Sequence, residues 1–170
     1  NGPGKITFPN GQIDEGVMKD NILDGPGKIT FPNGKIYEGV IKDDILDGPG
    51  KITFPNGKIY EGVIKDDILN GLGKITFLDG QIYEGVFKDD SLNGLGKIYN
   101  TQKRLIKNGE FTDGKLVSGI TYTWEGDGTC TKFDINGNYI QSHTNTINAL
   151  TDKINILTEL VHTLQEKSQL

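Results

Sequence analysis

The chain has 170 residues, with 24 glycines and a hydrophobic share of only 34%, which is lower than in a globular domain with one deep core. This composition favours an elongated repeat architecture over a compact domain. The formal net charge of -5 disfavours a nucleic-acid partner, because phosphate backbones are bound by clustered Lys and Arg.

Pairs of glycines recur with a period of 23 residues from the start of the chain. The first glycines of these pairs are Gly2, Gly25, Gly48, Gly71 and Gly94. A fixed period of this length is the signature of a repeat array. We therefore divide the chain into regular repeats at 1–99, degenerate terminal repeats that cap the array at 100–141, and a C-terminal segment at 142–170.

Each repeat is predicted to be a β-hairpin. In the second repeat, a short β-prone segment at 28–31 is followed by Pro32, Asn33 and Gly34, and then by a second strand at 35–42. Proline suits the first central position of a type I turn, and Gly34 suits the left-handed conformation that closes a three-residue loop.

The proline-centred turn also predicts which residues face each other across the hairpin. One face becomes apolar and the other carries charge, since side chains alternate along a strand. A two-residue turn at Asn33 and Gly34 is the alternative, and it would shift every pair. The pairs predicted from the proline-centred turn are Phe31 with Lys35, Ile29 with Tyr37, Gly27 with Gly39, and Lys28 with Glu38.

Residues 43–50 are predicted to link one hairpin to the next. Leu46 is expected to be buried in this linker, and its glycines are expected to provide the reversal of the chain. An isolated hairpin is not stable in water, so the hairpins are expected to stack into an elongated, single-layer antiparallel sheet. Each repeat would advance this mostly β structure by about 10 Å, giving a rod about 50 to 60 Å long.

The repeating unit resembles the MORN (membrane occupation and recognition nexus) repeat. The shared pattern is Tyr-Glu-Gly-x-x-Lys, followed in the next repeat by Gly-x-Gly-Lys-x-Thr-Phe-Pro-Asn-Gly. Residues 1–99 match this pattern strongly and 100–141 weakly. Ile41 and Ile64 stand where the family often has Trp, and Asp14 replaces the tyrosine in the first repeat. The resemblance implies a role in protein interaction and membrane association.

The C-terminal segment changes from a period of two to a helical period. Between about residues 144 and 167 we expect an amphipathic helix of about 36 Å. It would either dock on the last edge of its own sheet or form a coiled coil with another chain. Its apolar stripe consists of Ile147, Leu150, Ile154, Leu157, Val161 and Leu164.

No constellation for catalysis or metal binding is found in the sequence, so we expect no enzyme activity, no cofactor and no metal. The glycines before Lys28 lack the spacing of a phosphate-binding loop. Cys130, His143 and His162 lack the paired spacing of zinc ligands. The single cysteine excludes an internal disulfide, and no apolar run has the roughly 18 residues of a membrane span.

Two repeated sets of residues are singled out. The aromatic set is the best candidate for binding, and packing between hairpins is its alternative role. The second set is expected to be structural, at turns or under a closely approaching neighbour. The aromatic set is Phe31, Tyr37, Phe54, Tyr60, Phe77 and Tyr83, and the structural set is Gly34, Gly39, Gly57, Gly62, Gly80 and Gly85.

The sequence therefore predicts a non-enzymatic scaffold that presents a concave aromatic face to a helix or strand of a protein partner. The alternatives are a self-associating structural protein of the cytoskeleton or a virion, and an accessory array of a larger enzyme that associates with phospholipid. The phospholipid alternative is disfavoured because the repeat at 25–47 contains more acidic than basic residues. We expect an intracellular location, in the cytoplasm or at the cytoskeleton, a membrane or a virion.

Overall fold

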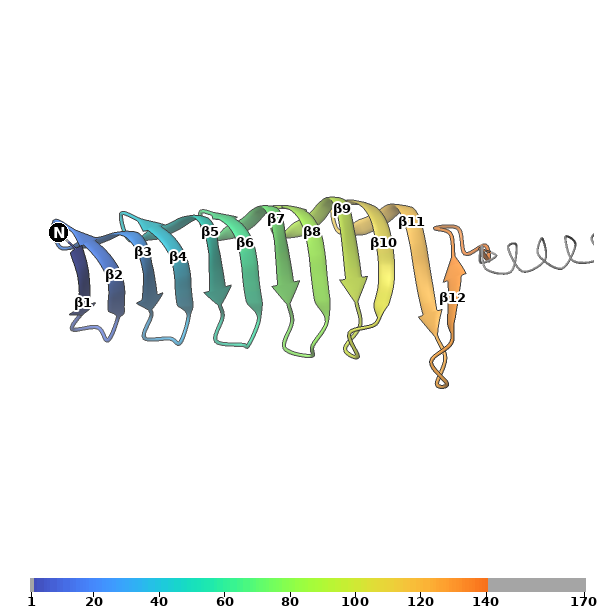
Figure 1. The fold of residues 1–170 in the computed structure, drawn as a ribbon, viewed down its shortest axis with the longest axis horizontal. Coiled ribbons are helices and arrows are strands. Elements are labelled where there is room, and N and C mark those ends of the chain that lie inside the picture. The colour runs from blue at the N-terminus through green and yellow to red at the C-terminus, as the bar shows by residue number, and fades with distance from the viewer. Residues whose placement is uncertain (1, 141–170) are drawn as a thin grey trace, which may run out of the picture.

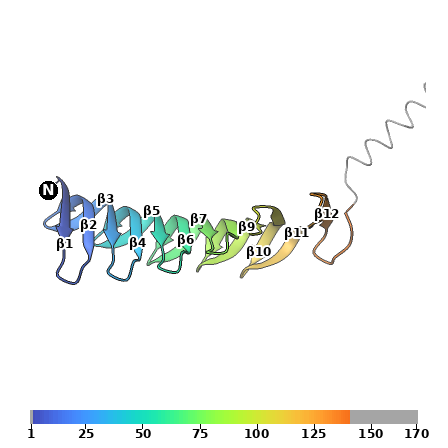
Figure 2. The same cartoon turned by 90° about the horizontal axis from the view of Figure 1, so that it is seen from below.

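The computed structural model describes residues 2–140, which form one open sheet of twelve antiparallel strands. Each strand pairs with its neighbours in sequence, so the chain advances along one axis from the N-terminal end (Figures 1 and 2). The strands are β1 (Gly2–Thr7), β2 (Ile13–Lys19), β3 (Ile22–Thr30), β4 (Ile36–Lys42), β5 (Ile45–Thr53), β6 (Ile59–Lys65), β7 (Ile68–Thr76), β8 (Ile82–Lys88), β9 (Ser91–Tyr99), β10 (Leu105–Thr112), β11 (Lys115–Trp124) and β12 (Cys130–Phe133).

The hairpin between β3 and β4 has the predicted proline-centred loop. The Phe31 amide donates to the Lys35 carbonyl at 2.9 Å, and the Gly34 amide donates to the Phe31 carbonyl at 2.9 Å. Gly34 has a φ of 85°, the left-handed conformation that closes such a loop. The predicted register is confirmed, with Ile29 opposite Tyr37 and Lys28 opposite Glu38.

The predicted linker at 43–50 is wrong in one respect, because its glycines do not reverse the chain. The reversal occurs at Asp43 and Asp44, whose φ angles are 49° and 62°. Two successive residues of positive φ form the tight hairpin turn whose twist matches the flanking strands, and aspartate tolerates this conformation better than most residues. The rest of the predicted linker belongs to β5, and Leu46 is fully buried there as expected.

One glycine from each of the first eleven strands forms a continuous row across the sheet. Paired glycines face each other at every step from β1 to β11. A side chain on Gly39 would place its Cβ 2.7 Å from the Gly50 Cα. This glycine row consists of Gly4, Gly16, Gly27, Gly39, Gly50, Gly62, Gly73, Gly85, Gly96, Gly109 and Gly119.

In the regular repeats a buried leucine covers the glycine row, and these leucines are Leu23, Leu46, Leu69 and Leu92. Between Gly39 and Ile41 the register shifts, so that Val40 lies opposite the three residues 47–49 of β5. This bulge bends β5 and turns Leu46 toward the glycine row. A methyl carbon of Leu46 lies 3.0 Å from the position that a Cβ on Gly39 would occupy. The leucine therefore fits only because the glycine row has no side chains.

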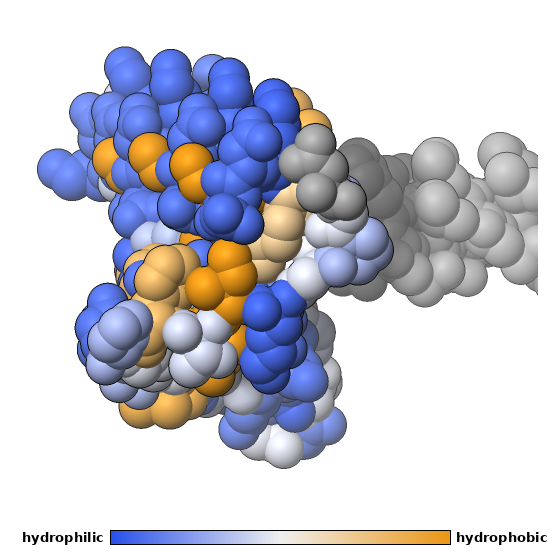
Figure 3. All heavy atoms as spheres, turned by 90° about the vertical axis from the view of Figure 1, so that its left-hand side faces the viewer, coloured by the Kyte–Doolittle hydropathy of each residue, from blue (hydrophilic) through white to orange (hydrophobic). Residues whose placement is uncertain are grey.

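The bent sheet has two unlike faces. The inner face carries the core, which consists of apolar residues from successive repeats such as Ile29, Tyr37, Ile41 and Leu46. The outer face carries the residues between them, such as Lys28. Figure 3 looks along the rod and shows hydrophobic residues gathered between a hydrophilic upper lobe and the lower lobe. Single-layer stacking with a core on one face agrees with the predicted fold class.

The hairpins after residue 99 keep much of the repeat geometry. At the turn before β10 the Pro-Asn-Gly triplet is lost, yet the Asn100 amide still donates to the Arg104 carbonyl at 2.9 Å. Lys103 takes the left-handed position there, with a φ of 60°. The C-terminal helix predicted at 142–170 lies outside the described residues. Within residues 2–140 no helix is long and apolar enough to cross a membrane.

Candidate functional site

An inner hollow of about 360 Å³ lies between the second and third repeats on the inner face. Phe31 comes from the loop after β3, and Tyr37 comes from β4. The other residues come from two successive two-residue turns and from the start of β5. The residues that line the inner hollow are Phe31, Tyr37, Asp44, Ile45, Asp66 and Asp67. Aromatic edges and carboxylates therefore share one site.

The aromatic residues of each repeat form an edge-to-face pair. Phe31 and Tyr37 have their ring centroids 4.8 Å apart with an interplanar angle of 71°. The same pair recurs as Phe54 with Tyr60 and as Phe77 with Tyr83. Tyr37 is only 4% exposed, and the phenylalanines are only partly buried against the core. Tyr37 and Tyr60 are therefore packed into the core, whereas Tyr83 is only partly buried, like the phenylalanines.

A lysine of the chain itself binds in this aromatic and acidic environment. Lys35 Nζ donates to Tyr37 Oη at 2.6 Å and to Asp67 Oδ2 at 3.3 Å. It also lies 4.7 Å from the centroid of the Tyr37 ring and 5.4 Å from that of Phe54. Lys58 repeats the ring contacts with Tyr60 and Phe77 at 4.6 and 5.3 Å. These distances are within the range of cation–π attraction.

The electrostatics of the inner hollow favour positive charge. Burial raises the pKa of Tyr37, and the hydrogen bond and the negative charge of Asp67 raise it further, so this phenol stays neutral. The hollow is lined by three aspartates, of which Asp67 is paired with the ammonium of Lys35. A cation entering the hollow would therefore meet carboxylates and the faces or edges of aromatic rings.

Asp67 differs from the aspartates at the same position of the neighbouring repeats. Asp44 Oδ1 accepts a hydrogen bond from the Leu23 amide at 3.2 Å, and Asp90 Oδ1 accepts one from the Leu69 amide at 2.8 Å. Asp67 Oδ1 is buried and has no hydrogen-bond partner among the described residues. The carboxylate of Asp67 bonds Lys35 instead, so the inner hollow is the place where this repeated contact is broken.

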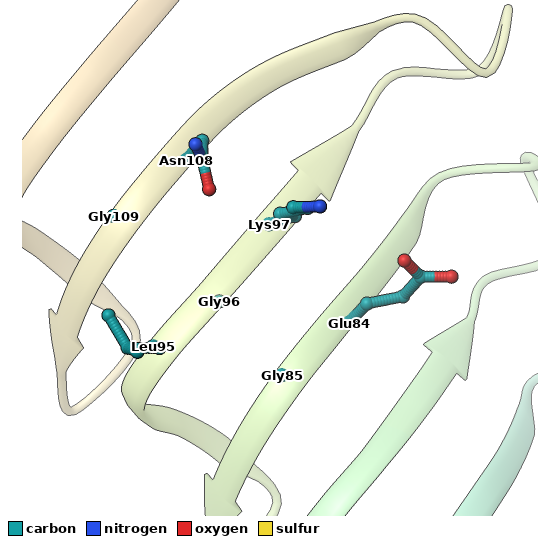
Figure 4. Close-up of a pocket in the computed structure, with 7 residues that line it drawn as sticks. All are labelled: Glu84, Gly85, Leu95, Gly96, Lys97, Asn108 and Gly109. Carbon is teal, nitrogen blue, oxygen red and sulfur yellow. The ribbon is translucent and has the colours of Figure 1, made fainter.

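A second hollow of about 380 Å³ lies on the outer face, across β8, β9 and β10 (Figure 4). Glu84 and Lys97 stand on one side and Leu95 stands on the other. Backbone of the glycine row forms the floor between them. Leu95 is 72% exposed, which is unusual for a large apolar side chain in a sheet. This outer hollow combines apolar and charged walls.

Sequence reasoning identified part of the inner hollow. Phe31 and Tyr37 were predicted as binding residues, and both line it. The carboxylates of Asp44, Asp66 and Asp67 were not predicted. These aspartates could have been predicted from the sequence, because an Asp-Asp pair recurs with the 23-residue period. The predicted structural glycines Gly39, Gly62 and Gly85 all lie in the glycine row.

The described residues offer no metal site. Among residues 2–140, no three side chains of His, Cys, Asp or Glu come close enough to hold an ion. Cys130 is exposed on β12, away from both hollows. The inner hollow is lined by aromatic rings, carboxylates and the aliphatic side chain of Ile45.

A family model described as MORN repeat matches residues 1–13, 15–36, 37–59, 60–82 and 83–101, which together make up more than half of the chain. One solved structure with similarity is the SAS-4 (dCPAP) TCP domain of Drosophila melanogaster, in complex with a proline-rich motif of Ana2 (dSTIL). It has 17% identity and a TM-score of 0.43, over 80% of each chain. No curated protein matches.

Proposed function

The chain belongs to the MORN repeat family, and we propose that it is a non-enzymatic scaffold that binds a protein partner along its inner face. The inner hollow and the aromatic pairs that recur along the same face form the binding surface. The observation that carries the proposal is the joint lining of the inner hollow by aromatic rings and aspartates.

The partner that fits this surface is an amphipathic helix or strand with basic residues beside its apolar face. Apolar side chains would contact Phe31 and Ile45, and Lys or Arg side chains would meet the aspartates of the turns. The chain's own Lys35 already makes this kind of contact with Tyr37, Phe54 and Asp67. Anionic lipid heads are disfavoured, because the same carboxylates would repel them.

Calorimetric titration with a designed peptide tests this proposal. The probe is a helical peptide with Leu at alternating spacings of three and four residues and Lys at the remaining positions. We expect binding that weakens at high salt and weakens about tenfold in Phe31→Ala, since one aromatic contact is worth about 1.4 kcal/mol. The same peptide with Glu in place of every Lys should not bind.

Matched carboxylate variants separate the inner surface from general attraction to an acidic chain. Asp44→Asn removes a charge that lines the inner hollow, and Glu38→Gln removes one from the outer face. The first should weaken peptide binding and the second should not. Equal loss in both variants, or equal binding of the Lys and Glu peptides, would count against a specific inner site.

A further inference from the structure

The outer face carries three rows of side chains that run along the rod, one residue from each of β1 to β9. The charged row is Lys5, Glu15, Lys28, Glu38, Lys51, Glu61, Lys74, Glu84 and Lys97. The outer apolar row is Pro3, Val17, Pro26, Val40, Pro49, Val63, Leu72, Val86 and Leu95. The third row, on the other side of the charged row, is Thr7, Ile13, Thr30, Ile36, Thr53, Ile59, Thr76, Ile82 and Tyr99. We call it the β-branched row, because every member except Tyr99 is β-branched.

No described residue covers this face, although much of it is apolar. Leu72 and Leu95 of the outer apolar row are 70% and 72% exposed, and Val40 is 43% exposed. Contiguous apolar rows of this length, about 40 Å over nine strands, mark an interaction surface in a protein dissolved in water.

The charged row alternates strictly, with Lys on odd-numbered strands and Glu on even-numbered strands. Neighbouring members already pair within the sheet, as in Lys74 with Glu61 at 2.6 Å and Lys5 with Glu15 at 3.0 Å. Their side chains remain between 37% and 58% exposed, so they can also meet charges from outside. Alternation makes the row complementary to a copy of itself.

Only one of two face-to-face arrangements uses this complementarity. A two-fold axis along the rod would give parallel copies and place each lysine against the same lysine of the second copy. A two-fold axis along the strand direction, passing between two strands, gives antiparallel copies. Odd strands then face even strands, so Lys faces Glu, the outer apolar row faces itself, and the β-branched row faces itself.

We propose that two copies of this chain pack back to back through their outer faces as an antiparallel dimer. With the axis between two strands, eight of the nine strands of each copy face each other. Eight strands by three rows cover about 40 by 20 Å, or about 800 Å² on each copy, which is the area of a standard stable interface. The outer hollow, lined by Glu84, Leu95 and Lys97, accepts side chains from the second copy. Both inner faces then point away from the interface, so the dimer presents two separate binding surfaces.

Light scattering of the full chain across a range of concentrations tests the dimer. We expect twice the chain mass of 18.6 kDa for the unchanged protein. The double variant Leu72→Asp with Leu95→Asp should raise the dimer dissociation constant about 100-fold or more, because two apolar contacts become buried charges. Leu78→Asp is the matched control and should remain dimeric, since Leu78 is 78% exposed but lies in a loop outside the three rows.

The melting temperature of the double variant at a concentration where it is monomeric shows whether it is still folded. Deletion of residues 142–170 should leave the dimer intact. A full-length chain that is monomeric at all concentrations overturns the proposal. It is also overturned by a dimer that survives the double variant, or by one that is lost on the deletion, which would assign pairing to the C-terminal segment.

Spin labels on Cys130, the only cysteine, test the orientation of the two copies. Because Cys130 lies on β12 at one end of the sheet, antiparallel copies would hold the two labels more than about 50 Å apart. Parallel copies would hold them within about 20 Å, since facing sheets are about 10 Å apart. A short distance between the labels overturns the antiparallel arrangement.

Discussion

The glycine row has no room for side chains at the points where the sheet bends. At Gly62, a Cβ would lie 2.5 Å from the Gly73 Cα and would also overlap the Leu72 carbonyl. The φ of Gly62 is 144°, which side chains rarely adopt. Because Gly62 has no side chain, β6 and β7 can approach each other closely and Leu69 can be buried over the glycine row.

Replacement of Gly62 with valine should therefore lower the free energy of unfolding by about 3 kcal/mol or more, through overpacking and backbone strain. Chemical denaturation followed by circular dichroism measures the change. Gly126→Val is the control, because a Cβ there meets nothing within 4 Å and Gly126 has no positive φ. Equal stability of the two variants would contradict the stacked-hairpin account.

Asp14 is a buried acid in the place of the repeated tyrosine, with only 1% of its surface exposed. Burial raises its pKa above the ordinary value of 3.8, and the nearby Asp44 adds to this, although a hydrogen bond from Gln12 opposes it. The folded state then holds this proton more tightly than the unfolded state. At a pH above the pKa that Asp14 has in the folded state, its ionised carboxyl destabilises the folded chain. This destabilisation disappears as the pH falls below 3.8, because the carboxyl is then protonated in both the folded and the unfolded state.

Asp14→Asn should raise the melting temperature at pH 7, because the amide can accept the Gln12 hydrogen bond without a buried charge. The advantage over the unchanged chain should vanish near pH 3. Melting curves of both proteins from pH 3 to 7 measure this difference in melting temperature. Asp47→Asn, at an exposed position, is the control. An advantage that does not depend on pH would mean that charge burial is not its cause.

At the scale of single residues, the sequence predicted which positions recur but not what all of them do. The aromatic and glycine positions were found because their period is fixed. The role of the Asp-Asp pairs was missed, because it depends on strands from different repeats being folded against each other.

Hairpins of two kinds alternate along the sheet. Loops such as the one at Gly34 use a three-residue turn, and the connections between hairpins use two residues of positive φ. The first kind was predictable, since proline and glycine have specific turn positions. The second kind was not predictable, because two successive aspartates are a weaker turn signal than Asn-Gly. The glycines nearby are a stronger turn signal, so the sequence placed the reversal at them.

Two turns of the second kind allow a matched comparison at the scale of elements. Asp67 and Asp90 have φ angles of 65° and 63°, and only Asp90 accepts a hydrogen bond from a backbone amide of the preceding repeat. Asp90→Gly should destabilise the chain by about 1 kcal/mol through the loss of that bond. Asp67→Gly should be neutral or slightly stabilising, since glycine adopts positive φ without strain.

Thermal unfolding of the two variants side by side measures this difference. If Asp67→Gly is the more damaging change, the contact of Asp67 with Lys35 stabilises the sheet more than the capping of Leu69 by Asp90 does. That order would reverse our assignment of the two turns.

At the scale of the whole molecule, the chain is a bent sheet with two surfaces of different chemistry. Its inner face carries rings and carboxylates, and its outer face carries alternating charges and apolar rows. We propose that the inner face binds a basic partner and that the outer face binds a second copy. The overall rod was predictable from the repeat period. The two surfaces were not predictable from the repeat period, because their shape depends on the bend of the sheet along the glycine row. That bend is seen only in the structure.

The most direct test of this account is a methyl NMR titration of the chain with the Leu-Lys peptide. The Ile45 methyl of the inner hollow should shift as the peptide is added, and the Leu72 and Leu95 methyls of the outer apolar row should not. The outer methyls should instead respond to protein concentration. Peptide-dependent shifts of Leu72 and Leu95 without a shift of Ile45 would contradict the assignment of partner binding to the inner face.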